Sequence, residues 1–243
     1  MNKILIFTGA GLSLESGISI FRGKDGLWNK HKIEEICIKG SFEGIYRQKS
    51  IDFYNERRVE LSNKKPNAAH KLIALLQKKY PKQIYNITQN VDNLLEKAGC
   101  SKVIHLHGEL TKVICENIDC KTIYNIGESK QKCACNICGG NLRPYVVLFY
   151  EDAPEYQNLK KAIEDTTMFL AIGTSGQVID IVKINRNYRH SILVNPNREV
   201  YYDQEKPSRH RVYIDEEFEY FFQKKATEAV QIILPIIENH LQA

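Results

Sequence analysis

Four cysteines in the middle of the chain have the spacing of a metal site. Cys115 and Cys120 are separated by four residues, Cys135 and Cys138 by two, and fourteen residues lie between the two pairs. Two close pairs, each held on a turn, are what tetrahedral coordination of zinc by thiolates requires. Cys133 is an alternative to Cys135 in the second pair. Because four thiolates leave no coordination position open, we predict one structural zinc ion, with free or redox-active cysteines as the alternative.

Two histidines, His105 and His107, are candidates for acid–base chemistry. Histidine has an ordinary pKa that lets it accept a proton near neutral pH, which makes it a natural general base. The two occupy alternate positions at the end of a strand predicted over residues 102–106, so they share a face, and His107 lies closer to the end of the strand. Taken by itself, an isolated histidine still favours a structural role.

A glycine turn near the N-terminus is the candidate for binding a phosphate. Gly9, Ala10 and Gly11 follow the apolar residues 4–7, which predict a buried parallel strand. Glycines there let the backbone adopt a positive φ and approach a ligand, and Ser13 can begin a helix whose N–H groups face an anion. The third glycine of the GxGxxG motif is absent, so an ordinary strand-to-helix turn is an equal alternative.

Further predicted strands also end in polar residues. Gln89, Asn90 and Asp92 follow the strand QIYNIT, Thr174 and Ser175 end the apolar run MFLAIGTS, and Asn195 ends SILVN. Open α/β sheets bind ligands outside the carboxyl ends of their strands. We therefore expect Gln89, Asn90 and Asp92 to lie at such a ligand-binding crevice.

The rest of the chain divides into helical and extended segments. Residues 29–79 are predicted to be mostly helical and too long for a simple crossover, so they include a helical insertion. His70, in the string PNAAH, is predicted to be a structural residue packed at a helix start. Residues 143–151 are predicted to return the chain to the sheet, 211–214 to form a final edge strand, and about 216 to 241 to form a C-terminal helix.

The composition fits one globular domain over residues 1–243, with 43% hydrophobic and 26% charged residues. The net charge of +5 arises from 34 basic and 29 acidic residues that are interspersed, so no surface dedicated to nucleic acids is expected. No apolar run reaches the roughly 20 residues of a membrane span, and no cleavable leader is expected. Clustering of five of the seven cysteines favours metal binding over disulfides. We expect a soluble, cytoplasmic protein; the sequence does not set its oligomeric state, although a monomer is favoured.

Ordered motifs across residues 4–198 resemble those of the sirtuins, the NAD-dependent protein deacylases. They are GAGLSLESGISIFRG with GLW after it, PNAAH, TQNVDNLLEKAG, HLHGEL, CGGNLRP, RPYVVLFYE and GTS. The resemblance implies an α/β fold with a doubly wound parallel, Rossmann-like sheet and a smaller zinc-binding and helical module. Residues 1–28, 80–108 and 143–243 would form the NAD-binding part, 29–79 the helical insert and 109–142 the zinc-binding insert. The CGGNLRP motif favours Cys135 over Cys133 as a ligand.

The resemblance also implies roles for individual residues. His107 would take a proton from the ribose, and Asn90 would be a second catalytic residue. NAD, as co-substrate, would be contacted by Gly9, Ala10, Gly11, Ser13, Phe21, Arg22, Gln89, Asn90, Val91, Asp92, Gly173, Thr174, Ser175 and Asn195. The other substrate would be the acylated lysine side chain of a protein. Val147 and Phe149 would border this acyl-lysine, in an extended segment that pairs with the substrate peptide.

Tyr54 and Arg57 lie three residues apart on a predicted helix and so share a face. From that spacing alone, a solvated helix surface with a half-buried tyrosine is favoured over a joint carboxylate site. The string FYNERR, however, resembles the Tyr-x-x-Arg element of the sirtuin branch that removes succinyl and malonyl groups from lysine. In that branch the pair binds the distal carboxylate, so the resemblance implies an acidic-acyl pocket.

The family reaction begins when the acyl oxygen of a modified lysine attacks the anomeric carbon of NAD as nicotinamide leaves, and it yields free lysine and O-acyl-ADP-ribose. Leu95, Tyr145 and Tyr150 replace the usual His, Asp and Gly, and a tyrosine at position 150 would crowd a bound peptide. We expect Leu95 to pack with little consequence, and the adenine contact is not assigned. An NAD glycohydrolase or ADP-ribosyltransferase on the same fold is the alternative function, and a zinc-containing binding module without activity is another.

Overall fold

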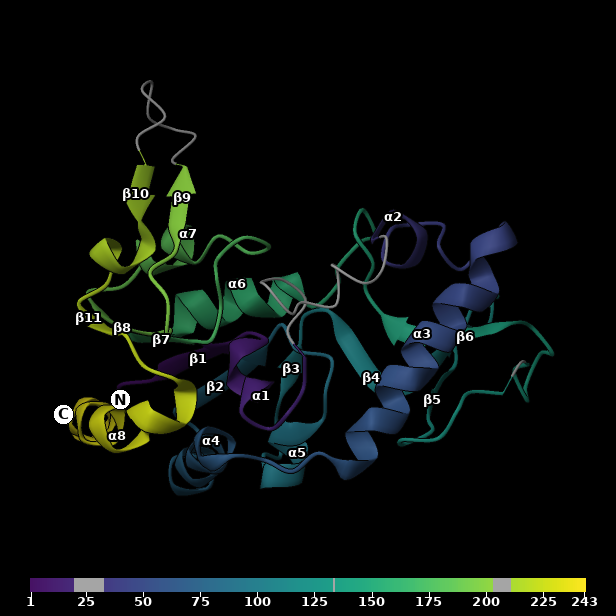
Figure 1. Cartoon of the computed structure of the whole chain (residues 1–243). Helices are drawn as coiled ribbons and strands as arrows, with labels where there is room; N and C mark the ends of the chain where they lie inside the picture. Colours follow the sequence, from purple (N-terminus) through teal and green to yellow (C-terminus); the bar gives the residue numbers. More distant parts are fainter. Residues whose placement is uncertain (20–32, 133, 203–210) are drawn as a thin grey trace.

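A six-stranded parallel sheet forms the centre of the larger of two lobes in the computed structural model (Figure 1). Its strands are β1 (Ile4–Thr8), β2 (Ile84–Thr88), β3 (Ile104–His105), β7 (Met168–Ile172), β8 (His190–Val194) and β11 (Tyr220–Phe222), in the spatial order β11-β8-β7-β1-β2-β3. The strands β2 and β3 therefore lie on one side of β1, and β7, β8 and β11 lie on its other side. The structure describes residues 1–19, 33–132, 134–202 and 211–243.

Helices cover both faces of this sheet. Successive side chains of a strand point to opposite faces, and every residue of β1 is buried. Ile4 and Ile6 pack in one core cluster with residues of α4 (Ala68–Lys79), α5 (Leu94–Ala98) and α8 (Ala226–Gln242), whereas Leu5 and Phe7 pack in another with α6 (Tyr156–Asp165) and α7 (Ile181–Asn185). The predicted doubly wound α/β fold is confirmed.

The smaller lobe combines a three-stranded antiparallel sheet with the helix α3 (Arg47–Glu60) and the short helix α2 (Ile33–Ile36) (Figure 1). Its strands β4 (Gly108–Cys115), β5 (Ile123–Asn125) and β6 (Leu142–Val146) have the order β5-β4-β6. The prediction that residues 143–151 return to the main sheet is wrong, since β6 pairs with β4. Burial alternates along β6, which is typical of a strand that buries one face, whereas the central strands β1 and β7 of the main sheet are buried at every residue.

The C-terminal segment also differs from the prediction. Residues Arg211–Tyr213 form β10, which pairs with β9 (Val200–Tyr202) in a separate ladder, so the predicted edge strand is wrong. The edge of the main sheet is β11 instead, because Phe221 and Phe222 pack against the core clusters on opposite faces. The last helix, α8, therefore begins only at Ala226, later than predicted.

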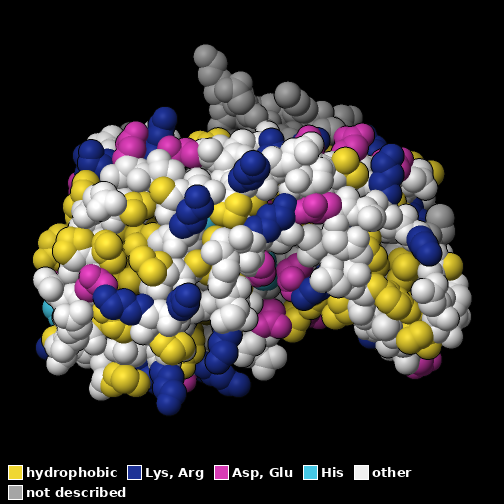
Figure 2. Space-filling view, turned by 90° about the horizontal axis from the view of Figure 1, so that it is seen from below, with side chains coloured by type: hydrophobic (Ala, Val, Ile, Leu, Met, Phe, Trp, Pro, Cys, Tyr) yellow, Lys and Arg dark blue, Asp and Glu magenta, His cyan; other side chains and the backbone are white. Residues whose placement is uncertain are grey.

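Helices account for most of the described part of residues 29–79, as predicted. Short 3-10 helices, Gly44–Tyr46 and Leu61–Asn63, flank α3. The helix α4 packs on the main sheet, so only the segment before it belongs to the smaller lobe. On the face that carries α4 and α8, basic side chains are scattered among acidic and apolar ones (Figure 2). Within the described residues, no helix combines the length and the apolar character needed to span a bilayer.

Candidate functional site

The candidate site lies along the carboxyl edge of the parallel sheet. Neighbouring parallel strands end at the same edge, so the connections that follow them converge there. The NAD-contact candidates are Gly9, Ala10, Gly11 and Ser13 after β1, Gln89, Asn90, Val91 and Asp92 after β2, Gly173, Thr174 and Ser175 after β7, and Asn195 after β8, and the base candidate His107 follows β3. Phe21 and Arg22 lie outside the described residues.

Glycines after β1 and β7 allow two turns to touch. The N–H of Gly11 donates to the carbonyl of Gly173 at 2.9 Å. A Cβ on Gly9 or Gly11 would lie only 2.7 Å from an atom of Gly173, so neither position accommodates a side chain. The expected positive φ at Gly9 and Gly11 is wrong, and it is Gly173 that has φ +64°. The helix expected at Ser13 is α1 (Gly11–Leu14), a single turn. Close backbone approach is thus the reason for these glycines.

Ser13 is the centre of a buried hydrogen-bond network. Its hydroxyl donates to Oδ2 of Asp92 at 2.9 Å and accepts from Nδ2 of Asn90 at 3.2 Å. Nε2 of His70 lies 3.3 Å from the same oxygen, and since Nδ1 accepts the N–H of Asn67, Nε2 carries the ring proton. A hydroxyl offers one proton and two lone pairs, and all three are used here. Ser13 therefore fixes the side chains of both Asn90 and Asp92.

Burial sets the protonation states in this network. It lowers the pKa of His70 to about 4, so the ring is neutral near pH 7. It raises the pKa of the Asp92 carboxyl, although hydrogen bonds from Leu94 and Ser13 oppose the shift. His70 is the structural residue that was predicted, because it forms the capping box at the start of α4 with Asn67. Its link to Asn90 through Ser13 is an additional feature that the sequence does not reveal.

His105 supports the backbone of Asn90. Its Nδ1 donates to the carbonyl of Asn90 at 2.8 Å, and its Nε2 lies 2.9 Å from Oε1 of Glu96. Burial lowers the pKa of His105, but the hydrogen bond and charge of Glu96 and the Asn90 carbonyl outweigh it, and the pKa lies above its ordinary value. With both nitrogens engaged, His105 positions Asn90.

His107 presents an unprotonated ring nitrogen just beyond the end of β3. Its Nδ1 lies 3.0 Å from the carbonyl oxygen of Gln89. A carbonyl can only accept, so Nδ1 carries the proton and Nε2 has the lone pair. Burial lowers the pKa of His107, although the hydrogen bond to Gln89 opposes the shift. A neutral ring with its lone pair at Nε2 is what a general base needs near neutral pH.

Amide side chains connect the turns after β2, β7 and β8. Nε2 of Gln89 donates to Oγ1 of Thr174 at 3.0 Å, and Nδ2 of Asn195 donates to the carbonyl of Thr174 at 3.0 Å. Ser175 follows directly and is half-buried. This row of amides and hydroxyls offers the donors and acceptors that the hydroxyls and phosphates of a dinucleotide require.

A cavity connects the network around Ser13 to helix α3. Its walls include Ala10, Ser13, Asn90, Val91 and Asp92 from the larger lobe, and Phe53, Tyr54, Arg57, Glu60 and Lys64 from the smaller lobe and the segment after it. Tyr54 and Arg57 therefore share one cavity with NAD-contact candidates. The solvated helix surface favoured by spacing alone is wrong for Tyr54, which is buried.

Glu60 is an ionic partner of Arg57 inside this cavity. Nη2 of Arg57 lies 2.9 Å from Oε1 of Glu60, and the guanidinium lies over the ring of Phe53, 5.6 Å from its centroid. Nε of Arg57 is buried and has no hydrogen-bond partner within the described residues. Burial raises the pKa of Tyr54 well above its ordinary value, so its phenol stays protonated and donates to Sγ of Cys37 at 3.6 Å. Arg57 thus retains an unused donor.

Val147 and Phe149 lie on the segment that follows β6. The N–H of Val147 donates to the carbonyl of His107 at 2.9 Å, which places Val147 beside the base candidate. The N–H of Phe149 donates to the carbonyl of Cys37, and its carbonyl accepts from Lys39, each at 2.8 Å. A peptide that added to this segment would therefore pair with residues other than Phe149.

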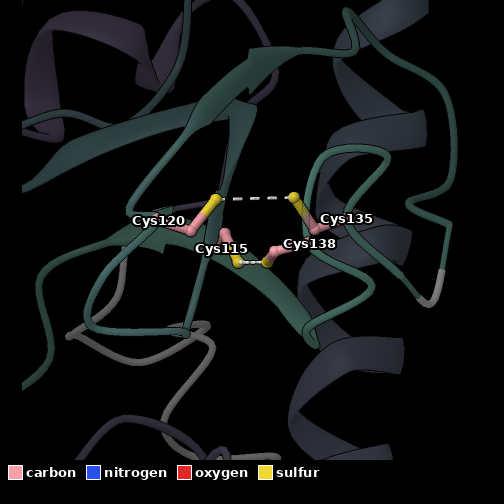
Figure 3. A group of neighbouring side chains, drawn as sticks. All are labelled: Cys115, Cys120, Cys135 and Cys138. Atoms are coloured by element: carbon pink, nitrogen blue, oxygen red, sulfur yellow. Dashed lines mark hydrogen bonds between the residues drawn. The ribbon is translucent and has the colours of Figure 1, made fainter.

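The four predicted zinc ligands converge at the end of β4 (Figure 3). The Sγ atoms of Cys115, Cys120, Cys135 and Cys138 all lie within 4.8 Å of one another, with 3.5 Å between Cys115 and Cys138 and 3.8 Å between Cys120 and Cys135. Four thiolates at Zn–S distances of about 2.3 Å in a tetrahedron have sulfurs about 3.8 Å apart, so the cluster fits a zinc ion. Backbone N–H groups of Ile137 and Gly140 donate to Cys135 and Cys138. Cys135 is thus in the cluster, and Cys133 lies outside the described residues.

Known proteins with this architecture identify the family. Residues 9–180 match the model of the Sir2 family. An NAD-dependent protein deacylase of Campylobacter jejuni (strain RM1221) is 42% identical over 210 residues, which cover 84% of this chain and 89% of that protein. The chain belongs to the Sir2 family. The prediction of an NAD-dependent enzyme is thereby confirmed.

Solved Sir2 structures resemble this one along nearly its whole length. A Sir2 homologue in complex with NAD superposes with a TM-score of 0.80 at 32% identity and covers 98% of this chain and 90% of its own. A mutant Sir2 homologue in complex with ADP-ribose gives a TM-score of 0.83 at 31% identity, covering 99% and 93%. The predicted arrangement of parallel sheet and helical module is therefore that of Sir2 proteins.

Two residues of this Sir2 chain adjoin the candidates without having been predicted. Glu60 pairs with Arg57, and an opposite charge three residues away on a helix was the available signal for it. Tyr156, at the start of α6, lies with its hydroxyl 3.3 Å from Nε2 of His107, and nothing in its local sequence indicates this contact. Leu95 packs in the core as expected.

Proposed function

We propose that this Sir2 protein removes acyl groups from the lysine side chains of proteins in an NAD-dependent reaction that releases nicotinamide and forms O-acyl-ADP-ribose. One observation carries the proposal. The neutral His107 and the anchored amide of Asn90 follow neighbouring strands at one sheet edge, and the backbone of His107 bonds to Val147, which adjoins the expected peptide segment. Relatives named NAD-dependent protein deacylase support it.

Each polar residue has a defined part in this proposal. NAD, when bound, would supply a ribose carbon open to attack and nicotinamide as the leaving group. Ser13 holds Asn90 and Asp92 at the cavity wall, where they would meet the nicotinamide ribose. His107 would take a proton from a ribose hydroxyl at Nε2, and the Gln89 carbonyl would stabilise the resulting imidazolium.

We further propose that the cavity beside α3 accepts acyl groups with a distal carboxylate, such as succinyl and malonyl. Tyr54 and Arg57 line the same cavity as Asn90, so an acyl chain that extends from the reaction centre into this cavity would meet both residues. Lys64 adds a second positive charge, while Glu60 offsets part of it. The pocket therefore accepts an acid without requiring one, and acetyl-lysine is expected to react as well.

We propose that the four cysteines hold one zinc ion with a structural role. Four protein ligands complete a tetrahedron, so no position remains for water or substrate. The N–H groups that point at Cys135 and Cys138 stabilise thiolates, as expected for ligands of a cation. The ion would hold together the two segments of the smaller lobe that carry the cysteines, and it would take no part in the reaction.

Analysis of the products by mass spectrometry tests the proposed function. Wild-type protein is incubated with NAD and with succinyl-lysine or acetyl-lysine peptides of one sequence, and a His107→Ala variant serves as the control. Formation of O-acyl-ADP-ribose together with unmodified lysine, lost in the variant, supports a deacylase. ADP-ribose without a change in the peptide would instead show an NAD glycohydrolase, and a peptide gaining ADP-ribose would show an ADP-ribosyltransferase.

A further inference from the structure

Tyr156 touches the ring nitrogen of His107 that the proposed reaction needs. Its hydroxyl oxygen lies 3.3 Å from Nε2, and the two rings are 6.3 Å apart at an interplanar angle of 45°. Tyr156 is the first residue of α6 and is 40% exposed. Burial raises the pKa of its phenol, so the hydroxyl carries its proton at neutral pH.

The direction of this hydrogen bond follows from the other side of the imidazole. Nδ1 of His107 donates to the Gln89 carbonyl, which leaves Nε2 without a proton. The phenol of Tyr156 must then donate to Nε2. An imidazole nitrogen has a single in-plane lone pair, so it accepts one well-aligned hydrogen bond at a time. A substrate hydroxyl that gives its proton to Nε2 needs that same lone pair.

We propose that Tyr156 is an additional residue of the active site. Its phenol caps the base: it donates to Nε2 of His107 at the position that the reacting ribose hydroxyl takes, until the substrate displaces it. The inference rests on the proposed role of His107 as the base. Tyr156 acts through His107 and is therefore a positioning residue. It keeps Nε2 hydrogen-bonded in the absence of substrate, at a contact that is exposed and therefore within reach of an incoming hydroxyl.

The surroundings of Tyr156 allow the displacement. The residue begins the helix, where its N–H is bonded to the carbonyl of Ala153, so the backbone is held while the side chain can turn. Because two fifths of the side chain is already exposed, turning outward buries no new polar group and removes little apolar contact. A ribose hydroxyl and the phenol are similar donors, so the exchange replaces one hydrogen bond with another.

Calorimetric titration with NAD tests the competition. The proteins are wild type, Tyr156→Phe, and His107→Ala and His107→Asn, each with and without Tyr156→Phe. Tyr220→Phe serves as a control. Tyr220 is equally exposed, at 41%, and stands on the opposite edge strand β11. Removing a hydrogen bond with a net value of about 0.5–1.5 kcal/mol should tighten NAD binding about two- to tenfold in Tyr156→Phe. In either His107 background, the same change should have no effect.

A second measurement reports the contact without NAD. The ¹⁵N resonance of Nε2 of His107 should move toward that of a free imidazole nitrogen in Tyr156→Phe and stay unchanged in Tyr220→Phe. The cap is overturned if NAD binding is unchanged or weaker in Tyr156→Phe, or if the Nε2 resonance does not move. Failure of the wild type to bind NAD would refute the proposed function instead, and the resonance would still decide whether the cap exists.

Discussion

Arg57 and Arg58 are neighbours in sequence, but we expect Arg57 to bind substrate and Arg58 to stabilise the fold. Replacing each of them with Met distinguishes these two roles. Arg57 lines the cavity, and its Nε is buried without a partner in the described residues. A charge-assisted hydrogen bond to a bound carboxylate contributes about 1.5–3 kcal/mol. Arg57→Met should therefore lower kcat/KM for a succinyl-lysine peptide about 10- to 150-fold. Its effect on the acetyl-lysine peptide of the same sequence should stay within about threefold.

Arg58→Met is the matched control. Arg58 is fully buried, donating from Nε to the carbonyl of Leu110 at 2.6 Å and from Nη1 to Oδ1 of Asn55 at 2.5 Å. Removing it takes the donor from the buried Leu110 carbonyl, at a cost of about 1–3 kcal/mol, whereas Oδ1 of Asn55 still accepts the N–H of Gln131 at 3.0 Å. Its melting temperature should therefore fall, whereas that of Arg57→Met should stay close to the wild-type value.

The assay measures kcat/KM for both peptides at saturating NAD, together with a melting curve for each variant. Glu60→Gln adds a second test, because this change removes the nearer ionic partner of Arg57 and leaves Glu56 at 3.9 Å. A half-exposed pair of this kind is worth about 0.2–1 kcal/mol, so kcat/KM for the succinyl peptide should rise by up to about fivefold while that for the acetyl peptide stays constant. Equal losses on both peptides in Arg57→Met would refute the carboxylate pocket.

Three further predictions concern the metal, the base and acid stability. The wild type should contain about one zinc ion per chain. Removing the metal with a chelator, or replacing Cys115 with Ser, should lower both the zinc content and the melting temperature, and an unchanged melting curve would contradict a structural site. Since the pKa of His107 is lowered and the base must be neutral, kcat/KM should fall only below a pKa that lies under 6.5, and a fall centred above 7 would exclude His107 as the base. The pKa of His70 is about 4 in the folded protein against 6.5 when exposed, so the unfolded state gains the proton first as the pH falls, and stability decreases between about pH 6.5 and pH 4. At pH 4.5 this contributes a loss of about 2–3 kcal/mol relative to pH 7, so in urea unfolding the loss should be smaller by this amount in His70→Gln than in the wild type.

Strands with a continuous apolar run could be predicted from the sequence, whereas the pairing of the shorter strands could not. The continuous apolar runs of β1 and β7 allow only a place inside a covered sheet. Residues 143–151 look similar in composition, yet β6 pairs with β4, because pairing is a long-range property that local pattern does not carry. The short strand β11 was missed for the same reason, since its aromatic residues gain their burial from both core clusters.

The candidate site was more predictable than the contacts within it. Spacing alone indicated the cysteine cluster, because zinc coordination demands two close pairs. The glycines after β1 were identified for the wrong reason, since what they permit is contact with Gly173. Tyr156 and the link from His70 to Ser13 join residues more than fifty positions apart or on separate elements, so they follow only from the folded structure.

Tyr150 is predicted from the sequence to crowd a bound peptide, and the structure gives its conformation. It has φ +69°, in the left-handed region that favours glycine, and it is 85% exposed. A left-handed conformation costs a residue with a Cβ about 1–2 kcal/mol. Glu151 offsets this cost, because its carboxylate accepts the N–H of Leu148 across the same turn and pairs with Arg143. The exposed ring therefore stands beside the segment proposed to bind peptide.

The central claim is that this Sir2 protein consumes NAD in order to deacylate lysine, and release of nicotinamide tests it most directly. Purified protein with NAD is assayed alone, with an acetyl-lysine peptide and with a succinyl-lysine peptide. We predict that release requires a peptide and is faster with the succinyl form. Equal release in all three mixtures would contradict the claim and show an NAD-consuming enzyme that does not act on acyl-lysine.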